Sequence, residues 1–375
     1  MVIYLIEILM IFILWPIHKI SVKISKRTIN GKTLYLFFIF LMFGLTMALR
    51  NVSVGSDTQT YNWIYQSIKN SDTLNKAFHL NTISSAPVYV FIQYICSRIF
   101  ASQQAGTILN SIIVAGGFYY YIRNNSTNYM FSSFLFVGLT LFFESMNGTR
   151  QFMAIAFAIN AYCFLKKNLK SIKGWILFGF AVGIHNTIVA FIITLIGVII
   201  KKKTRNFEKV FTASVVVSLV IAFAFSFLIN IVSKVFPYFN VYLNGNNSAQ
   251  MMENGGNGRI ILLFIFLGVI MIASKQCIKR SNYMVAEVDY VDVFLCFICV
   301  VLGMIFSRNI LFMRILWPFM CVFLVYLPNM FEIMAVKTKK IMMLGTVFVL
   351  SIYSILFLIE DKSSIIPYAF FWSKL

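Results

Sequence analysis

The chain has 375 residues, of which 60% are hydrophobic and only 12% are charged, and its mean hydropathy is +0.83. A soluble domain carries about 25% charged residues, so the composition excludes a soluble globular protein and indicates an integral membrane protein. The formal net charge of +20 does not indicate a nucleic-acid partner, because the basic residues lie in short loops between apolar runs, as the positive-inside rule predicts.

Continuously apolar runs, without alternation of apolar and polar residues, predict spanning helices and exclude an outer-membrane β-barrel. We predict an all-α, polytopic helical bundle that forms a single transmembrane domain over residues 1–375, with about twelve crossings and some short or re-entrant helices. The predicted spans are residues 2–17, 33–49, 106–122, 130–146, 150–165, 174–185, 186–200, 210–232, 259–274, 288–306, 310–331 and 341–359. With the basic loops inside, both termini are predicted to lie on the outer side, which requires an even number of crossings, as twelve provides.

The basic clusters define the inside loops, since positive charge is retained on the cytoplasmic side. These loops are Lys19–Lys32, Arg123–Tyr129, Lys166–Lys173, Lys201–Lys209, Lys275–Arg280 and Lys337–Lys340. Two longer segments, residues 50–86 and 233–258, are predicted to be outer loops. Residues 87–100 are apolar but shorter than the about 20 residues that a crossing needs, so we predict a re-entrant or surface helix there.

Two apolar stretches are too short for two comfortable spans and are predicted to be hairpins of short helices. One covers residues 130–165, with its tip at Glu144 to Gln151, and the other covers residues 173–201, with its tip at Gly183 to Thr187. Broken helices at membrane depth are tolerated where the backbone lines a polar cavity or is buried in protein. Both tips are predicted to face the outer side, which favours a shared cavity there.

Most arginines fall on the outer side, although topology alone disfavours positive charge there and is indifferent to arginine versus lysine. The outer arginines are Arg50, Arg98, Arg150, Arg259, Arg308 and Arg314. The planar guanidinium suits phosphate or carboxylate groups. We therefore expect a membrane protein that handles an anionic substrate on its outer side.

The first candidate site follows the second span. Arg50, a glycine turn at Gly55, Asp57 and Tyr61 are suited to bind a sugar and its phosphate. The alternative is that Asp57 is the N-cap of an amphipathic helix, which explains Asp57 but leaves Arg50 unexplained.

The second candidate site combines the two tips. Arg150 and Gln151 begin an apolar run, where a charge costs about 2.5–3.5 kcal/mol, and Glu144 is close enough in sequence to pair with Arg150. His185 is flanked by apolar segments and suits a general base on a sugar hydroxyl. The alternatives are an arginine that snorkels at a helix end and a hydrogen-bonded structural histidine.

The third candidate site combines Arg308 and Arg314 with Arg259, which opens another span at a glycine-rich loop. The i, i+6 spacing of the first two does not place them on one face of a straight helix. Cys296 and Cys299 form a bare pair without further ligands nearby. We therefore expect no metal and no cofactor.

The chain resembles the EpsG/Wzy-type surface-polysaccharide (O-antigen) polymerase family. The similarity lies in Gly55-Ser56-Asp57 to Tyr61, Arg150-Gln151 before Ala154, Ala156 and Ala158, Gly183 to Thr187, Arg308 to Arg314 and Ile366-Pro367-Tyr368. These motifs occur in the same order as in the family, across residues 50 to 370.

The resemblance implies a bacterial inner-membrane glycosyltransferase with undecaprenyl-diphosphate-linked oligosaccharide as donor and acceptor, and a chain-length regulator protein as a possible partner alongside membrane lipid. His185, Arg150 and Asp57 are then the expected catalytic residues. The expected substrate-binding residues are Arg50, Tyr61, Gln151, Arg259, Arg308 and Arg314. The alternatives are a lipid-linked oligosaccharide flippase and a membrane O-acyltransferase.

Overall fold

A computed structural model describes the chain except residues 25–26, 81–85, 101, 205, 236–257, 281–288, 308–309, 362 and 374–375. Most of the predicted outer loop at 233–258 therefore lies outside the described residues. The chain divides into two compact units, Met1–Val189 with Met343–Leu375, and Ala190–Met342. Each unit is described by itself, and the single transmembrane domain stays a prediction.

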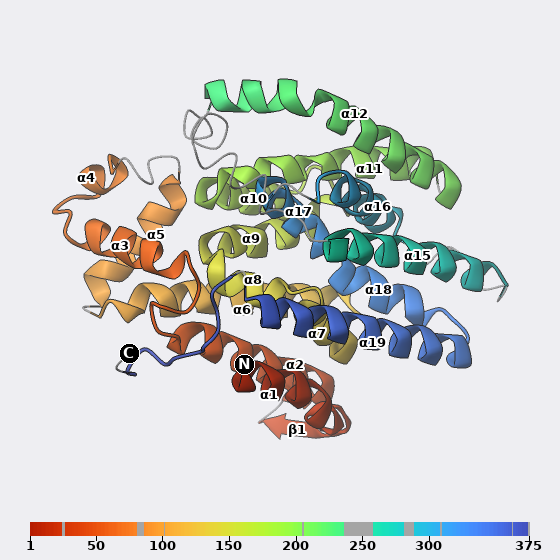
Figure 1. The fold of residues 1–375 in the computed structure, drawn as a ribbon, viewed down its shortest axis with the longest axis horizontal. Coiled ribbons are helices and arrows are strands. Elements are labelled where there is room, and N and C mark those ends of the chain that lie inside the picture. Colours follow the sequence, from red (N-terminus) through yellow and green to blue (C-terminus); the bar gives the residue numbers. More distant parts are fainter. Residues whose placement is uncertain are drawn as a thin grey trace. The chain divides into compact units, whose positions relative to one another are not determined.

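The first unit contains the N-terminal helices and the end of the chain (Figure 1). Its elements are α1 (Val2–Ile13), η1 (Trp15–Lys19), β1 (Ser21–Ile24), β2 (Arg27–Asn30), α2 (Gly31–Leu49), α3 (Thr58–Lys69), α4 (Leu74–Phe78), α5 (Pro87–Ile99), α6 (Gln104–Asn125), α7 (Tyr129–Gly138), α8 (Leu141–Asn147), α9 (Thr149–Leu165), α10 (Ile172–Ile184), the start of η2 (Asn186–Ile193) and most of α19 (Val336–Glu360). The helical prediction is confirmed, with one exception. Within the predicted inside loop Lys19–Lys32, β1 and β2 form a two-stranded antiparallel hairpin that pairs Ser21 with Asn30.

The second unit is also helical. It contains the end of η2, α11 (Thr194–Lys203), α12 (Phe207–Val235), α15 (Gly258–Arg280), α16 (Tyr290–Ile305), α17 (Ile310–Met320), α18 (Phe323–Glu332) and the start of α19. Helix α16 is buried along most of its length, because α11, α12, α15 and α17 pack around it. At its start, Asp289 caps the helix through the amide of Val291 and pairs with Lys201 of α11 at 3.1 Å.

Within the described residues, seven helices are long and apolar enough to cross a membrane, or up to eight if the bent pair α7–α8 counts as one span. The protein is therefore polytopic, and the count of twelve crossings stays a prediction. Several predicted spans correspond to helices of fewer than 18 residues, among them α10 and α11. The predicted short helix at 87–100 is present as α5, with 13 residues.

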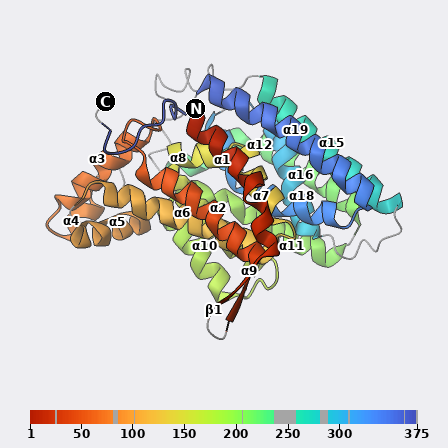
Figure 2. The same cartoon turned by 90° about the horizontal axis from the view of Figure 1, so that it is seen from below.

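Helix α9 is the centre of the first unit. It packs against α6, α8 and α10, and α6 packs in turn against α2; Figures 1 and 2 show these helices side by side. Small residues permit the contact between α6 and α9, since a Cβ atom on Gly117 would lie only 2.5 Å from the Cβ atom of Ala156. Close approach at small residues is a common way for membrane helices to associate, because lipid supplies no hydrophobic driving force between them.

We predict that Gly117→Ala destabilises the protein, because the added methyl group forces α6 and α9 apart at a cost of about 1–3 kcal/mol. Gly116→Ala is the matched control, since a Cβ atom there meets nothing within 4 Å and alanine favours the helix. Thermal unfolding in detergent measures both variants. Equal melting temperatures for the two variants would contradict the proposed close packing.

Candidate functional site

The helical structure of residues 130–165 is interrupted twice, so that this stretch forms three helices. Helices α7 and α8 meet at a bend of 54°, where Thr140 adopts a positive φ of 61°. Helix α8 then ends at Asn147 and α9 begins at Thr149, with Gly148 between them. The predicted tip at Glu144 to Gln151 therefore coincides with the α8–α9 junction, where the first amide groups of α9 lack partners within their own helix.

Arg50 lies at the end of α2 and is only 2% exposed. Its guanidinium group donates hydrogen bonds to the carbonyl of Met47 and, at 2.8 Å, to Oγ1 of Thr149. Burial lowers the pKa of Arg50 to about 10, against the opposing effect of nearby Tyr368, Tyr4 and Tyr61. Arg50 is thus charged at neutral pH and joins the end of α2 to the first turn of α9; its predicted contact with substrate stays a prediction.

The C-terminal segment, residues 361–373, pairs with the loop that follows α2. The amide of Asn51 donates to the carbonyl of Ala369 at 2.8 Å. The amide of Gly55 donates to the carbonyl of Ser364 at 2.7 Å. The hydroxyl of Tyr368 donates to the carbonyl of Thr46 at 3.0 Å. The Ile366-Pro367-Tyr368 motif therefore lies beside the Arg50 to Asp57 loop, an arrangement that the sequence analysis did not predict.

Asn147 holds the same loop from the other side. Its Oδ1 accepts hydrogen bonds from the hydroxyl of Ser56 at 3.0 Å and from the amide of Asp57 at 2.9 Å. Asp57 is the N-cap residue of α3, but its side chain makes no capping bond. The capping alternative for Asp57 is therefore correct in position only. Asn147 lies inside the predicted tip and begins the candidate motif Asn147 to Gln151, but its contacts with the loop after α2 were not predicted.

Arg150 and Gln151 lie in the first turn of α9 and contact different neighbours. The guanidinium carbon of Arg150 lies 5.7 Å from the ring centroid of Tyr89 on α5, and its Nε is buried without a hydrogen-bond partner. Gln151 donates to Oγ1 of Thr187 at 3.4 Å, and that hydroxyl lies 2.7 Å from Nδ1 of His185. The two predicted tips therefore meet, and the shared cavity between them stays a prediction.

The expected pairing of Glu144 with Arg150 is absent. Glu144 accepts a hydrogen bond at 3.3 Å from the hydroxyl of Ser363 in the C-terminal segment. Arg150 makes no salt bridge with another described residue. A half-buried cation at a helix N-terminus, with a buried and unsatisfied Nε, is an arrangement that favours binding of an anion.

The remaining predicted arginines belong to the second unit. Arg259 lies in the first turn of α15. The guanidinium carbon of Arg314 on α17 lies 5.8 Å from the ring centroid of Trp317. Arg308 lies outside the described residues. The structure thus brings together Arg50, Asp57, Arg150, Gln151 and His185 within the first unit, and the joint action of all the arginines stays a prediction.

We predict that Thr149→Val destabilises the protein by about 1.5–3 kcal/mol, because a buried hydrogen bond to the charged Arg50 is lost. Thr149→Ser keeps the hydroxyl group and should lose much less stability. Thermal unfolding of the purified variants in detergent distinguishes them. If both variants melted at the same temperature, the link between α2 and α9 would not depend on this hydrogen bond.

Comparison with known proteins identifies the family of the chain. Comparisons with curated proteins and with solved structures gave no match. The family model described as "EpsG family" matches residues 32–370, a range that includes Arg50, the α8–α9 junction, His185 and most of the C-terminal segment. The chain therefore belongs to the EpsG family and is a polytopic membrane protein of that family.

Proposed function

We propose that the protein is a bacterial inner-membrane glycosyltransferase. It polymerises undecaprenyl-diphosphate-linked oligosaccharide repeat units into O-antigen or capsular polysaccharide on the periplasmic side. Membership of the EpsG family, which is linked to exopolysaccharide synthesis, supports the pathway. The outer-side position of the site rests on the positive-inside rule.

Arg150 is the observation that carries this proposal. It lies in the first turn of α9, half-buried, with an unsatisfied Nε and with the Tyr89 ring on one side. An anion with several oxygen atoms satisfies both the guanidinium group and the amide groups of the helix terminus. The diphosphate leaving group of a lipid-linked donor is such an anion, and its charge increases as the glycosidic bond breaks.

The transfer needs a base as well as a site for the leaving group. In the proposed step, a hydroxyl oxygen of the acceptor repeat forms a bond to the anomeric carbon of the donor glycan. The bond between that carbon and the diphosphate breaks, and the diphosphate keeps the electron pair. His185 takes the hydroxyl proton through Nε2, while Thr187 fixes the ring through its contact with Nδ1.

The other predicted residues have supporting roles in this proposal. Asp57 and Tyr61 contact a sugar, and Gln151 holds Thr187 in place. Arg259, Arg308 and Arg314 are proposed phosphate ligands for the donor or the acceptor lipid. A separate chain-length regulator is the proposed protein partner.

Replacement of Arg150 tests the proposal. We expect Arg150→Ala to reduce transfer by about 10²–10³-fold, the usual loss when a group that stabilises developing negative charge is removed. In a deletion strain, a wild-type copy should restore a ladder of glycan lengths, and the variant should yield single repeats. Lys76→Ala removes another basic residue of the predicted outer face, in an exposed ion pair, and is the matched control.

The same gel separates the alternatives, provided immunoblotting shows equal protein levels. A full ladder in the deletion strain contradicts the proposal. Loss of every surface repeat indicates a flippase, and a normal ladder with altered decoration indicates an O-acyltransferase.

Replacement of His185 tests the proposed base. His185→Gln should slow polymerisation by about 10²–10⁴-fold at saturating substrate, the usual contribution of general base catalysis. Thr187→Val keeps the imidazole but removes its hydrogen bond, so a smaller loss is expected. The rate is measured with purified protein and a lipid-linked repeat. Full activity of His185→Gln would exclude His185 as the base.

A further inference from the structure

An apolar groove runs along the first unit between α6, α9 and α10, away from the polar cluster at the N-terminus of α9. Its volume is about 650 Å³, within the range of pockets that bind small molecules. Ile112 and Ile176 lie on its edges and are 61% and 54% exposed. In a membrane, a groove with such edges opens directly to the lipid chains.

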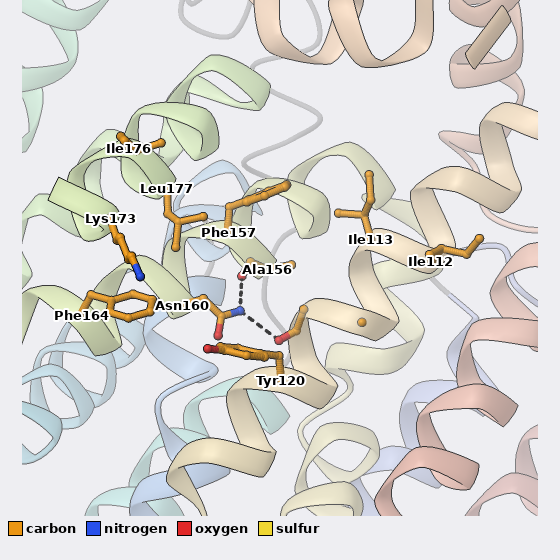
Figure 3. Close-up of a pocket in the computed structure, with 12 residues that line it drawn as sticks. Ile112, Ile113, Tyr120, Ala156, Phe157, Asn160, Phe164, Lys173, Ile176 and Leu177 are labelled. Atoms are coloured by element: carbon orange, nitrogen blue, oxygen red, sulfur yellow. Dashed lines mark hydrogen bonds between the residues drawn. The ribbon is translucent and has the colours of Figure 1, made fainter. Parts of the chain in front are cut away.

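Two polar groups lie at one end of this groove, as Figure 3 shows. The amide nitrogen of Asn160 donates to the carbonyl oxygens of Gly117 at 3.0 Å and Ala156 at 2.7 Å. Both amide hydrogens are thereby used. The residue is only 7% exposed, and its Oδ1 is buried without a hydrogen-bond partner. The side chain of Lys173 extends toward this amide from the start of α10.

The lysine-rich loop between α9 and α10 adds charge at the same end. It contains Lys166, Lys167 and Lys170 in addition to Lys173, and no acidic residue occurs between positions 150 and 207. By the positive-inside rule this loop lies at the cytoplasmic surface. Clusters of lysine beside spanning helices attract anionic lipid headgroups.

We propose that this groove is a binding site for a phosphatidylglycerol molecule of the cytoplasmic leaflet. One acyl chain lies between α6, α9 and α10, and the phosphate group contacts the ammonium group of Lys173. A hydroxyl group of the glycerol headgroup donates to Oδ1 of Asn160, the acceptor that the protein leaves unsatisfied. The groove thus matches an apolar chain, an anion and a hydroxyl donor in one ligand.

The glycan donor is a less suitable occupant of the same groove. Along α9, Leu165 packs against the start of α10 beside Lys173 and follows Arg150 by fifteen residues, or about 22 Å of helix. A diphosphate at Arg150 therefore cannot reach Lys173. The proposed lipid phosphate and the proposed diphosphate therefore have different ligands, and the two proposals are tested separately.

Native mass spectrometry of the purified full-length protein tests the proposal. The probes are phosphatidylglycerol and phosphatidylcholine with identical acyl chains, added at equal concentrations. We expect the wild type to prefer phosphatidylglycerol, and Lys173→Gln to bind it about fivefold more weakly, equivalent to about 1 kcal/mol. Lys167→Gln is the matched control, because Lys167 belongs to the same loop but does not line the groove.

A second pair of variants tests the groove itself. Gly116 lines the groove and a Cβ atom there would meet no protein atom within 4 Å, so Gly116→Leu should fill the space and abolish retention of the lipid. Gly179→Leu is the matched control, since Gly179 lies on α10 with equally open surroundings but outside the groove. Thermal unfolding in detergent is the check that both leucine variants are folded.

Three outcomes would overturn the proposal. The first is equal binding of both lipids by the wild type, and the second is unchanged binding by Gly116→Leu. The third is displacement of phosphatidylglycerol by an equal concentration of a polyprenyl phosphate, which would assign the groove to the isoprenoid carrier.

Discussion

The burial of one guanidinium group organises the end of the first unit at which α2 meets the start of α9. Arg50 ends an apolar span, and a charge in such a place must find hydrogen-bond acceptors within the protein. It uses a carbonyl of its own helix and the hydroxyl of Thr149. The second bond ties α2 to the first turn of α9, the turn that also carries Arg150. The position of the proposed anion site therefore depends on a residue that is itself almost inaccessible.

The backbone around Arg50 extends the same constraint to the end of the chain. On leaving α2, the backbone loses its helical hydrogen bonds, and within a membrane protein its polar groups need other partners. Residues 363–371 supply them through backbone bonds to Leu49, Asn51, Gly55 and Ser56. The hydroxyl of Ser363 also reaches Glu144. The C-terminal segment thus fixes the loop on one side while Asn147 fixes it on the other, and the carboxyl group of Asp57 is left without a capping role.

The parts of the site that could be predicted from the sequence are ionisable side chains, because burying them in a membrane costs free energy. Arg150 and His185 stand out within apolar runs, and the short lengths of those runs predicted the two helix breaks that bring Gln151 and Thr187 together. Backbone pairing between residues more than three hundred positions apart leaves no pattern of side chains, so the contribution of the C-terminal segment was not predictable. The role of Asn147 was equally unpredictable, because an asparagine at a helix break is suited to a turn whether or not it binds another loop. The number of crossings could not be predicted from helix length. Helix α10, for example, has 13 residues and covers about 20 Å, whereas the hydrocarbon core is about 30 Å thick.

Helix α9 carries polar groups near both ends, and its geometry keeps them separate. The contact of Gly117 with Ala156 brings α6 close to α9, and this proximity allows Asn160 to donate to a carbonyl of each helix. The oxygen of the same amide is buried without a donor, and an unsatisfied buried acceptor is costly. A larger residue at position 117 would separate the helices and remove the hydrogen bond from Asn160 to the carbonyl of Gly117. The small residues of α6 are therefore responsible both for the tight packing on one side of Asn160 and for the open, largely apolar groove on the other.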